Sequence, residues 1–120
     1  MEKLTYEQRI AAMRILLDII WADRRLDSRE KALFDEIAAQ LDLDMSARKA
    51  VEEQNSLLAL LAVRDMEQEQ KEKFAQMMGQ MIVVDRDINY DEVRIYNVVC
   101  EFCEIKEDFR IDDYPGLSRS

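Results

Sequence analysis

Hydrophobic positions recur at helical spacing along most of the chain. Behind Thr5 and Gln8, which together form a capping-box signal, apolar residues repeat every three or four positions and predict a helix to about Ala22. The same periodicity follows Asp27 and predicts a second helix to about Leu41. The first third of the chain is therefore expected to be a helical hairpin.

Four further helices are predicted downstream, two short and two long. Ser46 is the expected N-cap of the first of them, Asn55 or Ser56 of the second and Asn89 of the last. The predicted spans are 46–54, 56–63, 66–84 and 89–105. Gly79 is the only Gly or Pro before residue 115. The sequence thus predicts an all-α fold of about six helices.

The composition narrows the classes of function. The chain has 17 Lys plus Arg against 26 Asp plus Glu, a formal charge of −9 and no His. Without imidazole the usual catalytic triads and zinc sites are excluded. The negative charge would repel a phosphate backbone or an anionic lipid surface. We therefore expect a non-enzymatic protein that binds neither nucleic acid nor membranes and whose partner is another protein.

Length and apolar content bound the organisation of the chain. Its 120 residues correspond to one domain, which we place at residues 1–105, with residues 106–120 as a tail that is mobile unless something docks it. No apolar stretch approaches the roughly 20 residues needed to span a bilayer. The two Cys fit a reducing compartment. We therefore expect a cytoplasmic location and no membrane insertion.

Part of the sequence is repeated. Residues 19–43 align without a gap on residues 81–105, at a constant difference of 62 in residue number, with four of the 25 positions identical. Residues of the same type coincide on the predicted core face and in the loop, whereas unrelated amphipathic helices would agree on the core face alone. We infer a helix, acidic loop, helix unit used twice and predict that a pseudo-twofold axis relates the copies.

The repeated loops resemble the motif Ala-Asp-Gly-x-Ile-Asp-x-x-Glu, followed by an amphipathic helix, of the TerB-like domains. These occur in tellurite-resistance proteins and, in a related form, at the N-terminus of a DnaJ-like membrane chaperone. The matching segments are ADRRLDSREKALFDEIAAQLDLD and VDRDINYDEVRIYNVVCEFCEIK. The resemblance covers about residues 6 to 105 and implies an all-helical, non-enzymatic domain associated with stress or tellurite resistance.

The resemblance also implies a candidate metal site, because some TerB-like domains bind a divalent cation between the repeats. Carried over by position, the candidate ligands are Asp23, Asp27, Glu30, Asp85, Asn89 and Glu92. Oxygen donors of this kind suit Ca²⁺ or Mg²⁺. The chain departs from the motif at its Gly, which is Arg24 in one copy and Arg86 in the other. Arg adds a positive charge and lacks the conformational freedom of Gly.

A second interpretation of these residues needs no metal. Asp27 and Asn89 are suited to cap the helices that follow, and Glu30 and Glu92 lie three residues later, where they would close capping boxes. The remaining two aspartates could pair with the arginine of the opposite loop. The acidic loops are therefore either a cation site or a set of caps and ion pairs.

Other candidate residues have a structural and a functional interpretation. Cys100 and Cys103 resemble a redox pair, but the alignment places Ala38 and Leu41 at the same positions, which favours small core residues. The methionines of the 66–84 helix form either part of the core or a groove for a partner helix. Trp21, next to the first acidic loop, is expected in the core, with a partner surface as the alternative.

Three functions fit this sequence. The first is a TerB-like binding module that acts through its acidic loops on a divalent cation or a basic partner. The second is an interaction domain that binds another protein without any metal site. The third, an enzyme, would need two carboxylates with different pKa values in one pocket. The sequence does not determine the oligomeric state.

Overall fold

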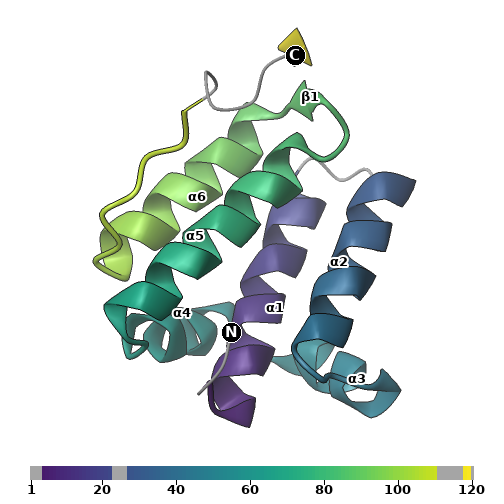
Figure 1. Ribbon diagram of the computed structural model, residues 1–120, viewed down its shortest axis with the longest axis vertical. Coiled ribbons are helices and arrows are strands. Elements are labelled where there is room, and N and C mark those ends of the chain that lie inside the picture. Colours follow the sequence, from purple (N-terminus) through teal and green to yellow (C-terminus); the bar gives the residue numbers. More distant parts are fainter. Residues whose placement is uncertain (1–3, 23–26, 111–117, 120) are drawn as a thin grey trace.

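The computed structural model describes residues 4–22, 27–110 and 118–119, and in this part of the chain it has the six α-helices that the sequence predicts (Figure 1). The helices are α1 (Tyr6–Trp21), α2 (Ser28–Gln40), α3 (Met45–Glu53), α4 (Ser56–Arg64), α5 (Gln68–Val83) and α6 (Tyr90–Phe102). The two-residue strands are β1 (Asp87–Ile88) and β2 (Ser118–Arg119). Within the described residues, no helix is both long and apolar enough to cross a membrane.

α1 lies in the middle of the molecule and contacts each of the other helices (Figure 1). Its start has the predicted capping box: the Gln8 backbone N–H donates to Thr5 Oγ1 at 3.0 Å, and the Thr5 backbone N–H donates to Gln8 Oε1 at 3.1 Å. Because neighbours surround it, α1 is buried on several sides. Its buried residues are Ile10, Ala11, Ala12, Met13, Ile15, Leu16, Ile19 and Ile20.

Two helix starts differ from the prediction. α3 is capped by Asp44, not by Ser46: the Asp44 carboxylate accepts from the Ala47 backbone N–H at 3.0 Å and from the Ser46 hydroxyl at 2.7 Å. A carboxylate can accept both hydrogen bonds at once, and its negative charge interacts favourably with the positive end of the helix dipole. α5 begins after Glu67, which forms a capping box with its third residue. Asn55 caps α4, which agrees with the prediction that Asn55 or Ser56 would do so.

α2 and α6 correspond residue for residue at the difference of 62 that aligns the repeated segments. Each has 13 residues, and two positions after each helix comes a residue with positive φ, Asp42 at 57° and Glu104 at 59°. In each, the N–H after that residue donates to a carbonyl oxygen five residues earlier, at 2.9 Å and 2.8 Å. This is the Schellman type of helix end. The duplication itself and the pseudo-twofold axis stay predictions.

The C-terminal segment contacts the helical body at two places. The rings of Phe109 and Tyr96 form an edge-to-face contact, with centroids 5.8 Å apart. β2 pairs in parallel with β1, with Asp87 opposite Ser118 and Ile88 opposite Arg119. These contacts lie in the segment that the sequence assigns to a mobile tail, and its mobility stays a prediction.

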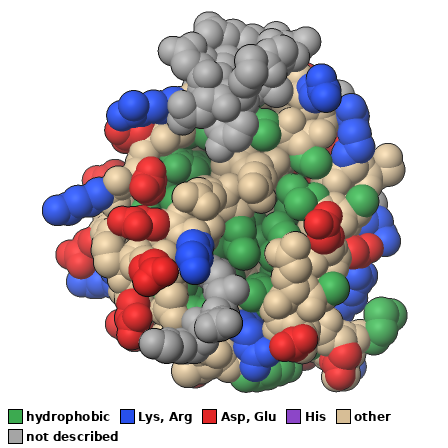
Figure 2. Space-filling model, in the orientation of Figure 1, with side chains coloured by type: hydrophobic (Ala, Val, Ile, Leu, Met, Phe, Trp, Pro, Cys, Tyr) green, Lys and Arg blue, Asp and Glu red, His purple; other side chains and the backbone are tan. Residues whose placement is uncertain are grey.

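The core is drawn from all the helices and contains Phe74, Met78, Met81 and Ile82 of α5, all fully buried. The methionines of α5 are thus mainly core residues, which confirms the structural interpretation. The described residues have a radius of gyration of 13.3 Å. On the face shown in Figure 2, charged side chains line the flanks and hydrophobic ones show along the middle.

Candidate functional site

The described residues that flank the two acidic loops lie at the same end of the molecule. The end of α1 and the start of α2 lie beside the end of α5, β1 and the start of α6 (Figure 1). Asp85, between α5 and β1, favours the charged form of Arg29 in α2 and so helps to raise the pKa of that guanidinium, although the Asp27 hydrogen bond is the larger cause. The structure therefore brings part of both loops into electrostatic range of each other.

Asp27 and Asn89 both act as helix caps. The Arg29 backbone N–H donates to Asp27 Oδ1 at 2.7 Å, and the Arg29 guanidinium donates to both oxygens of the same carboxylate at 3.2 Å and 3.1 Å. These hydrogen bonds, led by the side-chain one, hold the pKa of Asp27 below its ordinary value. Asn89 Oδ1 accepts from the backbone N–H groups of Asp91 and Glu92 at 2.8 Å and 3.4 Å. The capping role proposed for this pair is confirmed.

Glu30 and Glu92 are buried at corresponding places in the first turns of α2 and α6. Only 1% and 2% of their surfaces are exposed. Carboxylates are seldom buried to this extent unless they are paired. The sequence identifies both as members of a capping signal, and it gives no sign of their burial.

Asp85 and Arg86 shape the second loop. Asp85 Oδ1 accepts from the Asp87 backbone N–H at 3.0 Å. Arg86 occupies the Gly position of the TerB-like motif and has a positive φ of 62°, a conformation that favours Gly and costs other residues roughly 1–2 kcal/mol. The backbone at this position thus has a conformation that favours Gly, although this chain has Arg there.

The cation site stays a prediction. Of the six candidate ligands, Asp23 lies outside the described residues, as does Arg24. Among the residues that the structure describes, no three Asp, Glu, Cys or His side chains gather where they could hold a metal ion. Two of the other five candidates cap helices and two are buried.

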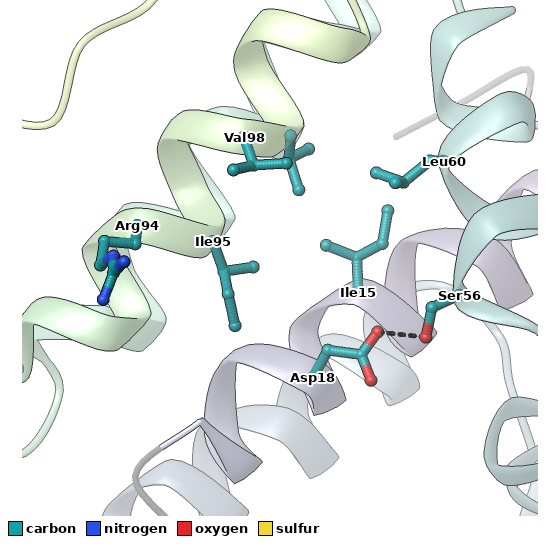
Figure 3. A pocket seen from close by; sticks show the side chains of 8 residues that line it. Ile15, Asp18, Ser56, Leu60, Arg94, Ile95 and Val98 are labelled. Atoms are coloured by element: carbon teal, nitrogen blue, oxygen red, sulfur yellow. Dashed lines mark hydrogen bonds between the residues drawn. The ribbon is translucent and has the colours of Figure 1, made fainter.

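A second candidate site is an apolar hollow between α1, α4 and α6 (Figure 3). Its volume is about 300 Å³. Ile15 and Val99, both buried, line it together with Leu60, Ile95 and Val98. Asp18 and Ser56 meet at one edge of the hollow, whereas Arg94 lies on the side of α6, beyond Ile95. This combination of apolar walls and a few polar groups is typical of binding sites.

A polar network fixes the distance between α1 and α4 beside this hollow. The Ser56 hydroxyl donates to Asp18 Oδ2 at 2.7 Å, the dashed contact in Figure 3. Arg14 forms an ion pair with Asp18 at 3.1 Å and donates to the Glu52 carbonyl oxygen at 2.8 Å. Asp18 therefore has partners on both helices and is not a free charge for a ligand.

α4, whose Leu60 lines this hollow, also exposes large apolar side chains to solvent. Leu57, Leu58 and Leu61 are 72%, 58% and 46% exposed. Across the hollow, Val98 of α6 is also exposed, and Phe102 packs under the Arg64 guanidinium, 5.6 Å from the ring centroid. The sequence signal was present in the run SLLALLAVR, which is apolar on every helical face. It predicted the helix, but not which of its faces would stay uncovered.

The cysteine and tryptophan expectations have different outcomes. Cys100 and Cys103 are both buried free thiols, and burial raises the pKa of each to about 11. They are protonated near neutral pH and belong to the core, as the duplicate positions indicate. The core position expected for Trp21 is wrong: it is 52% exposed on the outward side of the last turn of α1, whereas Ile19 and Ile20 of the same turn face the core and are buried.

Comparison with known proteins identifies the fold and no more. No protein-family model matches the chain, and no curated protein matches it. A similar solved structure is the crystal structure of a protein of unknown function from Porphyromonas gingivalis W83. That protein is 18% identical to this chain, with a TM-score of 0.71, over 89% of this chain and 84% of that one. The TerB-like resemblance is thus neither supported nor opposed by a relative of known function.

Proposed function

We propose that this chain is a non-enzymatic protein-binding module and that its binding surface is the hollow between α1, α4 and α6 with the adjoining face of α4. The observation that carries the proposal is the exposure of Leu57, Leu58 and Leu61 on α4, the helix that also contributes Leu60 to an apolar hollow of about 300 Å³. Full burial of one such side chain contributes roughly 1.5–3 kcal/mol, so a partner that covers this surface gains a large driving force.

The hollow suits a partner's side chains better than a reaction. Ile15, Leu60 and Val99 offer no acid, base or nucleophile. Asp18, the only carboxylate among the described residues that line it, is held by Arg14 and Ser56. An apolar recess of this kind is typical of sites that receive an apolar side chain of a partner helix.

Site-specific photo-crosslinking tests this proposal. A photoreactive amino acid at Val98, on the wall of the hollow, should give a discrete adduct with one partner protein in the native cells. The matched control places the same group at Glu72, on the exposed side of α5. Adducts that are identical from both positions, or none from Val98, would contradict the proposal.

A second candidate function comes from the TerB-like resemblance and is a cation-dependent role in stress or tellurite resistance. The observation that favours it is the burial of Glu30 and Glu92 at corresponding positions beside the loops. Thermal melting with EDTA and then with added Ca²⁺ or Mg²⁺ tests it, because an ion at 100 times its Kd stabilises by about 2.7 kcal/mol. If Asp85→Asn abolishes the rise in melting temperature on adding the ion, the acidic loops are supported as the cation site. Both proposed functions include a cytoplasmic location.

A further inference from the structure

α4 is apolar on all its sides, although one side faces solvent. Ala59 and Val63 are fully buried against the rest of the molecule. Successive residues turn by about 100° around a helix, which places Leu57, Leu58 and Leu61 on the opposite side, where they are exposed. A helix that is hydrophobic all round is normally buried. The outward side of α4 therefore has the composition of a surface that another molecule covers in the functional state.

A second hollow, of about 460 Å³, lies on the other side of α4, next to the start of α1. Leu58 and Leu61 belong both to this hollow and to the exposed side of α4. Glu7 and Asp65 also line it. The remaining lining residues are Thr5, Gln8, Gln54 and Ala62.

The charges around this second hollow are one-sided. No Lys or Arg is among its described lining residues, and within the described part of the chain neither Glu7 nor Asp65 has an ion pair. Cations near α4 have partners of their own: Arg14 pairs with Asp18, Arg94 pairs with Asp91, and Arg64, at the end of α4, lies over the ring of Phe102. The chain as a whole has a charge of −9. The described residues that line this hollow beside Leu58 and Leu61 therefore carry only negative charge.

We propose that the exposed side of α4, between the two hollows, binds an amphipathic helix of a partner protein whose apolar face is bordered by Lys or Arg. Its apolar side chains cover Leu57, Leu58 and Leu61, and its cations lie beside Glu7 and Asp65. This inference rests on the proposed function and adds the chemistry of the partner. A second copy of the chain is disfavoured as the occupant, because it would bring the same acidic residues together.

The probe is a labelled peptide of about 18 residues, five helical turns, made of Leu and Lys at helical spacing. The matched peptide has Glu in place of every Lys. Fluorescence anisotropy at about 0.15 M ionic strength, where charges further apart than about 8 Å are largely screened, measures both dissociation constants. We expect the Lys peptide to bind at least about tenfold more tightly than the Glu peptide, a difference of about 1.4 kcal/mol.

Variants of the chain locate the binding. Leu58→Ser should weaken binding of the Lys peptide about tenfold. Tyr90→Ser, at an exposed aromatic residue at the start of α6, should leave the dissociation constant unchanged. The double variant Glu7→Gln, Asp65→Asn should weaken binding about fivefold or more. The charge-matched control, Glu36→Gln with Glu72→Gln on the exposed sides of α2 and α5, should change it less than about twofold.

Each other outcome overturns the inference in a distinguishable way. If both double variants have the same effect, the peptide responds to the overall charge and not to this hollow. If the Lys and Glu peptides bind equally and Leu58→Ser weakens both, the partner is not basic, while the protein-binding proposal stands. If neither peptide binds, a helix on α4 is refuted, and crosslinking from Val98 decides the proposed function independently. Circular dichroism of each variant confirms that it is folded.

Discussion

Replacing Glu104, which follows α6, by Gly should stabilise the protein. Its φ of 59° lies in the left-handed region, which costs a residue with a Cβ roughly 1–2 kcal/mol. Gly has no such cost, but its unfolded chain is more flexible, which subtracts roughly 0.5–1 kcal/mol. We therefore expect Glu104→Gly to raise the free energy of unfolding by about 0.5–1 kcal/mol. For a domain of this size that corresponds to a rise in Tm of about 2–5 °C.

The matched control is the same substitution at a position with helical backbone. Glu36 is exposed in the interior of α2, where Gly costs about 0.8–1 kcal/mol. Urea denaturation followed by circular dichroism should therefore give opposite signs for Glu104→Gly and Glu36→Gly. A loss of stability in both variants would refute the positive φ at residue 104 and with it the matched ends of α2 and α6.

Three further predictions concern the caps, the core and the link between α1 and α4. Asp27→Asn should make the free energy of unfolding less dependent on acid pH. The pKa of Asp27 in the folded state lies below its ordinary value of 3.8, so the stabilisation by the Asp27 carboxylate is complete above pH 3.8 and is lost as the pH falls through the folded pKa. Urea unfolding curves of both proteins at decreasing pH would show the difference. Cys100 and Cys103 have pKa values of about 11, so a thiol reagent near neutral pH should label them only after urea unfolds the chain; rapid labelling of the native protein would contradict their burial. Ser56→Ala removes the 2.7 Å bond to Asp18 and should lower the free energy of unfolding by about 0.5–1.5 kcal/mol; no change in urea unfolding would mean that the network does not hold α4.

The helices could be predicted from the sequence because their determinants are local. Thr5, Asp27 and Asn89 cap helices in the structure as their positions indicate. A cap bonds to backbone N–H groups two or three residues away, so neighbours in sequence are sufficient to specify it. The wrong cap was Ser46, where a competing acceptor, Asp44, stands two residues earlier and takes the Ser46 hydroxyl as one of its own donors.

The candidate site depended on relations that no local pattern contains. Glu30 and Glu92 are suited by type to a solvent-exposed helix start, and their burial arises from how the helices around them pack. Trp21 is apolar enough for the core and is nevertheless exposed, because the neighbouring helices cover the side of α1 that carries Ile19 and Ile20 and leave the side that carries Trp21 open. The apolar hollow joins Ile15, Leu60 and Val99 from three helices far apart in the sequence.

The sequence by itself determined that this protein is an all-helical domain with an acidic character, since periodicity, capping and composition act over a few residues or over the chain as a whole. Only the tertiary structure decided which apolar surface is buried. α4 is hydrophobic on every side, and the free energy of burying Ala59 and Val63 instead of Leu57 and Leu58 depends on the shape of the neighbouring helices. That choice leaves the leucines of α4 exposed, and it is the physical basis of the binding surface proposed above.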